Sequence, residues 1–191
     1  MARATRILLI ANCLIFILEK LLGDSVIEAF ALWPLGTHFQ FWQLLTSGFL
    51  HASWMHLLAN MFGLWMFGRD VELRLGTRNF LQLYFASMFT AAIAQLAVTA
   101  MLQQDVPTLG ASGAVFGVLG AFAMLFPERV IVLLIPPIPL PARVFVFFYA
   151  VIELILGVTS TQSGVAHFAH IGGLIGGIII VRRWRRRRSS F

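Results

Sequence analysis

Six long apolar runs divide this 191-residue sequence and limit what it can fold into. Each run is near the length of about 20 residues that an α-helix needs to cross a bilayer. The chain is 59% hydrophobic and 12% charged, which excludes an ordinary soluble domain and a disordered chain. We therefore expect an all-α polytopic membrane protein, a single domain over 1–191 with six transmembrane helices. The runs are 7–22, 51–67, 80–102, 110–126, 144–158 and 165–181.

The distribution of arginine predicts the orientation of these spans. With six spans, all thirteen arginines fall on one side, and only Lys20 departs from the pattern. By the positive-inside rule, the short N-terminus 1–6 and the Arg-rich tail 182–191 are cytoplasmic, and the protein is a multi-pass protein of the cell (inner) membrane. We interpret the basic tail as an anchor at anionic lipid, with no nucleic acid as partner. The loop 23–50 is aromatic, so we expect it to lie in the outer leaflet.

Several polar side chains stand near the outer ends of the apolar runs, where they are costly and mark a functional site by default. Three groups share this depth, so we expect them to meet. The second run contributes His51, His56 and Asn60, the fourth Ser112, and the sixth His167 and His170.

Glycine spacing predicts how two of these groups approach each other. The fourth and sixth runs each carry a small-xxx-small pair, a pattern that lets helix backbones pack closely in lipid. Packing through these pairs would bring Ser112 beside His170. A serine hydroxyl next to a neutral imidazole supplies a nucleophile and its general base. The pairs are Gly113 with Gly117 and Gly173 with Gly177.

The length of the fourth run predicts that Ser112 lies below the membrane surface. From Ser112 to Phe126 is about 22 Å of helix, against a hydrocarbon core of about 30 Å. Segment 103–111 must then dip inward, which is tolerated where backbone lines a wet cavity or is buried in protein. We expect a water-accessible pocket that opens outward, with Ser112 at its floor.

Together, three segments resemble the signature of the rhomboid intramembrane serine proteases: HASWMHLLAN at 51–60, GASGAVFG at 110–117 and AHFAHIGG at 166–173. The resemblance covers nearly the whole chain, including FGRDVE at 67–72, and implies a six-helix rhomboid bundle. It implies that Ser112 is the nucleophile and His170 the base of a dyad without an acid. It also implies that His56 and Asn60, with the Ser112 backbone N–H, form the oxyanion site.

Other residues around this site have more modest interpretations. Gly110, Gly113 and Gly173 are expected to pack near it, and Phe116, one turn after Ser112, against the His170 ring. Glu153 is the only carboxylate well inside a span, and we interpret it as a packing or gating residue. His167 and His51 are interpreted as structural. The family often has Arg where this chain has Gln43, which predicts the loss of one loop contact.

The function expected is cleavage of single-pass transmembrane proteins near the outer end of their helix, with the bilayer and these substrates as partners. No cofactor and no metal are expected, because neither an HExxH nor a paired-carboxylate pattern is present. One alternative is an inactive rhomboid-like protein that binds transmembrane segments. GASG alone also fits simple helix packing. A transporter or proton channel would need carboxylates along several spans, and only Glu153 qualifies.

Overall fold

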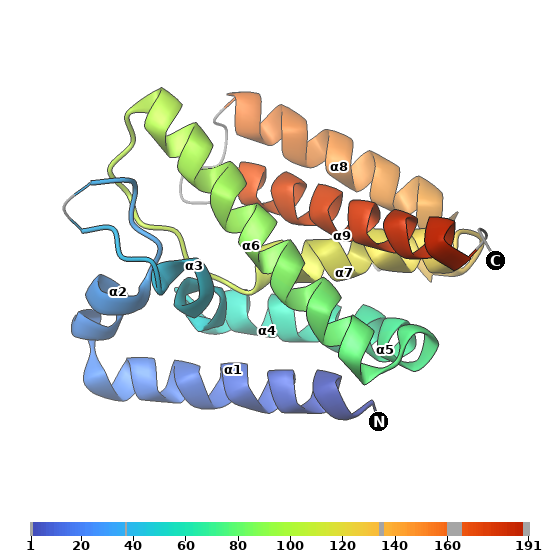
Figure 1. The fold of residues 1–191 in the computed structure, drawn as a ribbon, viewed down its shortest axis with the longest axis horizontal. Coiled ribbons are helices and arrows are strands. Elements are labelled where there is room, and N and C mark those ends of the chain that lie inside the picture. Colours follow the sequence, from blue (N-terminus) through green and yellow to red (C-terminus); the bar gives the residue numbers. More distant parts are fainter. Residues whose placement is uncertain (1, 37, 134–135, 160–165, 189–191) are drawn as a thin grey trace.

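The computed structural model describes residues 2–36, 38–133, 136–159 and 166–188, and these residues are mostly helical (Figure 1). Each predicted apolar run falls largely within helix, although the sixth begins outside the described residues. The helical elements are α1 (Arg3–Leu22), α2 (Asp24–Phe30), α3 (Gln43–Thr46), η1 (Ser47–Phe49), α4 (Trp54–Gly63), η2 (Leu64–Gly68), α5 (Arg69–Leu75), α6 (Thr77–Leu102), α7 (Ser112–Leu125), α8 (Ala142–Thr159) and α9 (His167–Arg188).

One small sheet departs from the all-helical expectation. Strands β1 (Val130–Val132) and β2 (Pro139–Pro141) pair antiparallel, with Ile131 opposite Leu140. Prolines cannot donate to a ladder, so they are tolerated in a two-stranded hairpin where every strand is an edge. The hairpin separates α7 from α8 and keeps the proline-rich segment out of both helices.

Two helices in the described part of the chain, α6 and α8, are long and apolar enough to cross a membrane. α7 is apolar but shorter, at 14 residues. α9 continues through Arg188, so the predicted tail from 182 begins as helix. Arg185 Nη1 there donates to the carbonyl of Met124, 3.2 Å away, at the end of α7. The count of six spans stays a prediction.

The centre of the bundle is α7, which contacts α4, α6, α8 and α9 (Figure 1). Residues 113–122 of α7 are all buried. A helix that is apolar on every face belongs in such a position. Because α7 begins at Ser112, this serine is the first residue of the most enclosed helix.

Glycines let α7 and α9 touch backbone to backbone. A Cβ on Gly173 would overlap the carbonyl of Gly113, and a Cβ on Gly177 would overlap that of Gly117. The two helices therefore pack in the register that the glycine pairs predict. No side chain at 173 or 177 fits without moving one helix away from the other.

Glu72 joins three helices at the other end of the molecule. Its carboxylate accepts hydrogen bonds from the backbone N–H groups of Ala4 and Thr5 and from the hydroxyls of Thr5 and Thr77, at 2.8–2.9 Å. The N–H groups of the first turn of a helix have no partner within it, and Glu72 satisfies two of them in α1. Burial alone would raise the pKa of Glu72, but these hydrogen bonds outweigh it and hold the pKa below its ordinary value.

The described residues of segment 23–50 are partly helical, with α2, α3 and η1 among them, rather than a plain loop. Gln43 at its centre is 1% exposed. The Gln43 side chain accepts hydrogen bonds from the N–H groups of Trp33 and Gln40, and it donates to the carbonyl of His38 at 3.1 Å. The expected loss of a loop contact at this position is therefore offset, because the glutamine makes loop contacts of its own.

Candidate active site

The chain enters α7 through a turn that only glycine fits. Gly110 has φ +130°, a conformation that side chains rarely adopt, and its N–H donates to the carbonyl of Ser47 at 2.9 Å. A Cβ on Gly110 would lie 2.8 Å from His56 Nε2 and 3.7 Å from Ser112 Oγ. The missing side chain thus leaves a space that the His56 ring and the Ser112 hydroxyl both border.

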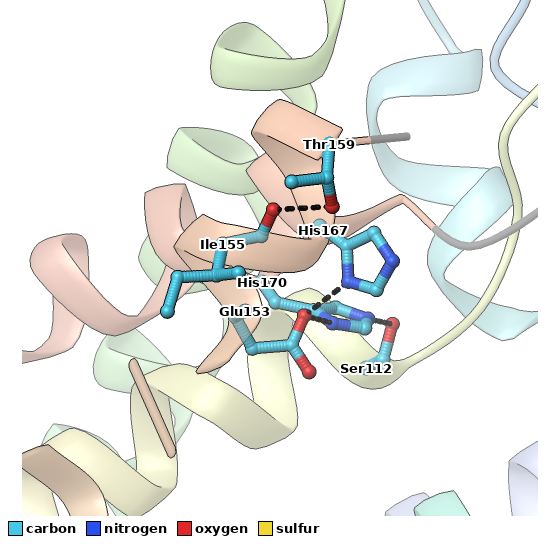
Figure 2. Close-up of polar contacts among 6 residues, drawn as sticks. All are labelled: Ser112, Glu153, Ile155, Thr159, His167 and His170. Carbon is cyan, nitrogen blue, oxygen red and sulfur yellow. Dashed lines mark hydrogen bonds and ion pairs between the residues drawn. The ribbon is translucent and has the colours of Figure 1, made fainter. Parts of the chain in front are cut away.

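Ser112 and His170 meet across the contact between α7 and α9. His170 Nε2 lies 2.8 Å from Ser112 Oγ, although 58 residues separate them in the sequence (Figure 2). His170 is 9% exposed. The Phe116 ring stacks on the His170 ring with centroids 4.4 Å apart and an interplanar angle of 6°, which fixes the plane of the imidazole. This geometry allows a proton to pass from the hydroxyl to the imidazole.

Glu153 of α8 reaches the other side of the same imidazole. Its Oε2 lies 2.8 Å from His170 Nδ1 and 2.7 Å from His167 Nδ1 (Figure 2). Glu153 and His167 are 5% and 4% exposed. The expectation that no acid lies beside the dyad is wrong, because Glu153 is at hydrogen-bond distance from His170. A packing or gating role for Glu153 stays a prediction. His167 shares this carboxylate oxygen, which is consistent with its interpretation as a structural histidine.

The positions of Glu153 and the two histidines in the sequence could have indicated that they lie close together. Glu153 stands six residues before the end of α8, and His170 stands three residues after the start of α9. A buried carboxylate needs donors, and two histidines are at its depth on the next helix. What the sequence could not supply was the rotation of α8 about its axis.

His56 and Asn60 both lie on α4, and the His56 ring borders the space beside Gly110. The His56 backbone N–H is capped by Ser53 Oγ at 3.1 Å, and the His56 ring packs 5.1 Å from the His51 ring. Asn60 is buried, and its Nδ2 donates to the carbonyl of His56 at 3.0 Å. The structure thus places the His56 ring at the space beside Gly110 that the Ser112 hydroxyl also borders. The side-chain amide of Asn60 hydrogen-bonds within its own helix.

His51 is fully buried and ties α1 to the start of α4. Its backbone N–H donates to Glu19 Oε2 at 3.0 Å, and its ring meets that of Phe16 edge to face. These contacts agree with a structural role. They also place a second imidazole behind His56, away from Ser112.

One cluster in the described part of the chain has the composition of a metal site. The ligating atoms of Glu153, His167 and His170 lie within 4.8 Å of one another, and all three residues are buried. These are ligand types that zinc accepts. Both histidines place their Nδ1 atoms at hydrogen-bond distance from one carboxylate oxygen, so the same atoms also form a hydrogen-bonded group.

The comparisons with known proteins identify the family of this chain. The model of the rhomboid domain matches residues 38–187. The chain is 33% identical to "Rhomboid protein 1, mitochondrial" of Saccharomyces cerevisiae over 88% of its length, and 33% identical to "Rhomboid protease GluP" of Bacillus subtilis over 72%. It is 30% identical to "Rhomboid protease GlpG" of Yersinia enterocolitica over 92%.

The chain spans 55%, 25% and 60% of the length of these three relatives, so the resemblance concerns their shared domain. That domain contains every side chain of the cluster around Ser112. The match covers most of the chain and includes relatives at 30% identity or above, and it carries with it a polytopic membrane bundle. This chain belongs to the rhomboid family.

Proposed function

We propose that this protein is an intramembrane serine endopeptidase that cuts single-pass transmembrane proteins near the outer end of their helix. The observation that carries the proposal is the 2.8 Å separation of His170 Nε2 and Ser112 Oγ at the start of a buried helix. The relatives named as rhomboid proteases support the same reaction class. An inactive relative that only binds transmembrane segments would not require a serine hydroxyl at hydrogen-bond distance from an imidazole.

In the proposed reaction His170 takes the Ser112 proton as the oxygen attacks the scissile carbonyl. An acyl-enzyme forms, His170 returns the proton to the leaving amine, and water from the outer side resolves the ester. No metal or cofactor enters these steps. The substrate segment must be unwound at the cut, so helix-breaking residues there should favour cleavage.

The oxyanion that develops would be held by the Ser112 backbone N–H, His56 and Asn60. Ser112 is the first residue of α7, where backbone N–H groups lack partners within the helix. The His56 ring borders the same space beside Gly110. Donors aimed at charge that exists only in the transition state lower the barrier without tightening substrate binding.

The proposed setting is a cell (inner) membrane with both termini cytoplasmic and the site open to the extracytoplasmic side. Substrate would enter laterally from the lipid, past α8 and the segment 159–164, most of which lies outside the described residues. Thirteen arginines on one side of six spans support this orientation.

The test is cleavage of a generic single-pass substrate by the purified chain in liposomes. Ser112→Ala and His170→Ala should each abolish cleavage, and the double variant should be no worse, because members of one catalytic unit are not additive. A fluorophosphonate should label wild type and not Ser112→Ala. Ser87→Ala is the matched control: Ser87 is a buried serine on α6 that packs against α7 at Gly117. It should cleave normally. Wild-type activity in Ser112→Ala would refute the serine mechanism.

The oxyanion assignment has its own test. Loss of one such donor typically costs about 10²–10³-fold in kcat; we expect the low end or less for Asn60→Ala and His56→Ala, because other donors remain. Both should still react with a fluorophosphonate, and the double variant should be slower than either. If Asn60→Ala lowered only the melting temperature and kept kcat, Asn60 would be a helix-packing residue.

A further inference from the structure

We propose that Glu153 completes the catalytic group as a positioning residue, by holding His170 in the tautomer that leaves Nε2 free to accept the Ser112 proton. The group would then be a serine, a histidine and a glutamate drawn from three helices, α7, α9 and α8. This inference rests on the proposed function, since it names a further residue for the same reaction.

The burial of α8 singles out Glu153. Of the eighteen residues in α8, only Ala142, Val146 and Glu153 are buried. Large apolar side chains such as Phe147 and Ile152 point away from the bundle. Glu153 is thus the one buried polar side chain of α8, and it meets the candidate base. A carboxylate placed there for packing alone would cost free energy that an apolar residue would not.

Proton accounting gives the carboxylate its role. An ionised carboxylate only accepts hydrogen bonds, so the two nitrogens on Oε2, His167 Nδ1 and His170 Nδ1, must each carry a proton. A neutral imidazole has one N–H, so His170 Nε2 is then unprotonated and faces Ser112 Oγ as an acceptor. The opposite tautomer would aim an N–H at the serine and leave the base without a lone pair to use.

The carboxylate also matters after the proton has moved. His170 then becomes an imidazolium inside the protein, where a nearby negative charge is worth more than in water. Glu153 Oε2, 2.8 Å from Nδ1, supplies that charge without moving. In a serine protease, replacing a buried carboxylate at this position by its amide lowers kcat by about 10⁴-fold, through the wrong tautomer.

His167 keeps the carboxylate in place. It stands one turn before His170 on α9, and both rings donate to the same Glu153 oxygen. The planes of the two imidazole rings are 84° apart. Two donors from one helix fix the carboxylate relative to α9. When His170 rotates or changes charge, His167 still holds Oε2.

A bound divalent cation is the competing explanation of the same cluster. Two ligands on one tetrahedral zinc, each about 2.0–2.1 Å from the ion, must stand more than about 3 Å apart. The two nitrogen–oxygen distances here are 2.7 and 2.8 Å, which is hydrogen-bond geometry. The observations therefore favour the protonated group, and the cation becomes an outcome of the test.

The first measurement is kcat and KM of Glu153→Gln and Glu153→Asp, in liposomes with the full chain. Glutamine keeps the size but removes the charge, and aspartate keeps the charge but shortens the side chain. A positioning carboxylate predicts that kcat falls by about 10²-fold or more in Glu153→Gln with KM within about threefold, and that Glu153→Asp retains more activity than Glu153→Gln. A packing role predicts the reverse order, because glutamine fills the space better. That reverse order would overturn the proposal.

Glu72→Gln is the matched control, since it is the same substitution at a buried carboxylate far from Ser112. It should lower stability and leave kcat per folded molecule unchanged. A fall in kcat equal to that of Glu153→Gln would show a general effect of carboxylate loss and count against the proposal. Cleavage that EDTA abolished and Zn²⁺ restored would make the cluster a metal centre and overturn it too.

The second measurement does not depend on proteolysis. Nitrogen NMR of the 15N-histidine-labelled protein should find His170 protonated at Nδ1 in wild type and shifted toward Nε2–H in Glu153→Gln, with His170→Asn assigning the signal. Finding His170 protonated at Nε2 in wild type would overturn the proposal.

If Ser112→Ala stayed active, the proposed function would fail while the tautomer result still decided the role of Glu153. If Ser112→Ala were inactive and Glu153→Gln fully active, only the role of Glu153 would fail.

Discussion

The two helices that flank the candidate base, α7 and α8, are attached to the bundle in opposite ways. α7 is buried over ten consecutive residues, and its glycines put its backbone against that of α9. α8 buries three of eighteen residues and lies at the outer edge of the bundle beside α9 (Figure 1). The first contact brings the two backbones together at glycines, and the second is made by a few side chains that include a carboxylate.

This difference divides the site into a fixed part and a peripheral part. Ser112 and His170 belong to helices that cannot separate without losing a large shared surface. Glu153 belongs to a helix whose other side chains mostly face outward. Elements with few buried contacts open at lower free energy than the core does. The nucleophile and base should therefore be insensitive to changes on α8, except through Glu153 and the rings that touch the dyad.

The largest effect should come from adding one carbon to the α7–α9 contact. Gly173→Ala places a methyl group on the Gly113 carbonyl, so α9 must move away and carry His170 with it. We expect at least about 100-fold loss of cleavage, since small misplacement of catalytic groups costs this much, and a lower melting temperature.

The matched change on α8 is Gly157→Ala. A Cβ there would meet His167 Cβ at 3.1 Å and the Phe168 ring at 3.2 Å, so a shift of a few tenths of an ångström between α8 and α9 would relieve the contact. Cleavage should fall by less than about threefold, since overpacking that neighbours can absorb costs little. Equal losses in the two variants would contradict the division into fixed and peripheral parts.

A smaller effect on cleavage is expected from substitutions of the aromatic rings through which α7 contacts α8 and the His170 ring. Phe116 of α7 stacks on His170, and Tyr149 of α8 packs 5.0 Å from Phe116 on its own side. Phe116→Leu should lower kcat by about 3- to 10-fold, because an aromatic pair is worth about 0.5–1.5 kcal/mol. Tyr149→Phe keeps the ring and should stay within about twofold. A greater loss in Tyr149→Phe than in Phe116→Leu would place the sensitive contact on α8.

The smallest effect on chemistry should come from Glu72, which joins α1, α5 and α6 away from both parts. Its pKa is held below the ordinary value in the folded protein, so its stabilisation is present at neutral pH and is lost as pH falls through that lowered pKa. Wild type should melt a few degrees, about 4 °C, above Glu72→Gln at pH 7.

The two melting curves of this pair should then converge as the pH drops below about 4. The rate of cleavage per folded molecule at pH 7 should be the same in both. A gap in melting temperature that persisted at low pH would mean that the Glu72 charge does not supply the stabilisation.

The sequence predicts much of this architecture because helix periodicity and glycine spacing are local. The described parts of the six apolar runs fall largely in helices, and the glycine pairs of α7 and α9 meet in the register that their spacing implies. The family resemblance is confirmed by the matched domain. The number of spans is not settled in the same way, since α1 carries Arg3, Arg6, Glu19 and Lys20 and does not reach the apolarity of α6 or α8.

What the sequence could not predict depends on how elements rotate and fold back. The rotation of α8 about its axis is set by packing. An 18-residue apolar helix has no polar face from which its inward side could be predicted. The contact of Glu153 with two histidines was therefore missed. The same holds for Gln43, whose amide turns into its own loop to replace an expected contact. The Glu153 partners are 14 and 17 residues away in the sequence, and the Gln43 partners are close in sequence but lie in an irregular loop, where helix spacing rules do not apply.

The glycine contact between α7 and α9 makes their alignment along the helix axis discrete. The Gly113 carbonyl fits only where α9 has no side chain, so α9 cannot slide by a fraction of a turn. The next glycine on that face is four residues on, a displacement of about 6 Å, and it would bring Val181 against Gly117. A step of that size takes the imidazole entirely out of reach of the hydroxyl. When α9 slides along its axis, the hydrogen bond between Ser112 and His170 is therefore either fully formed or fully broken. A small sliding motion cannot weaken it gradually.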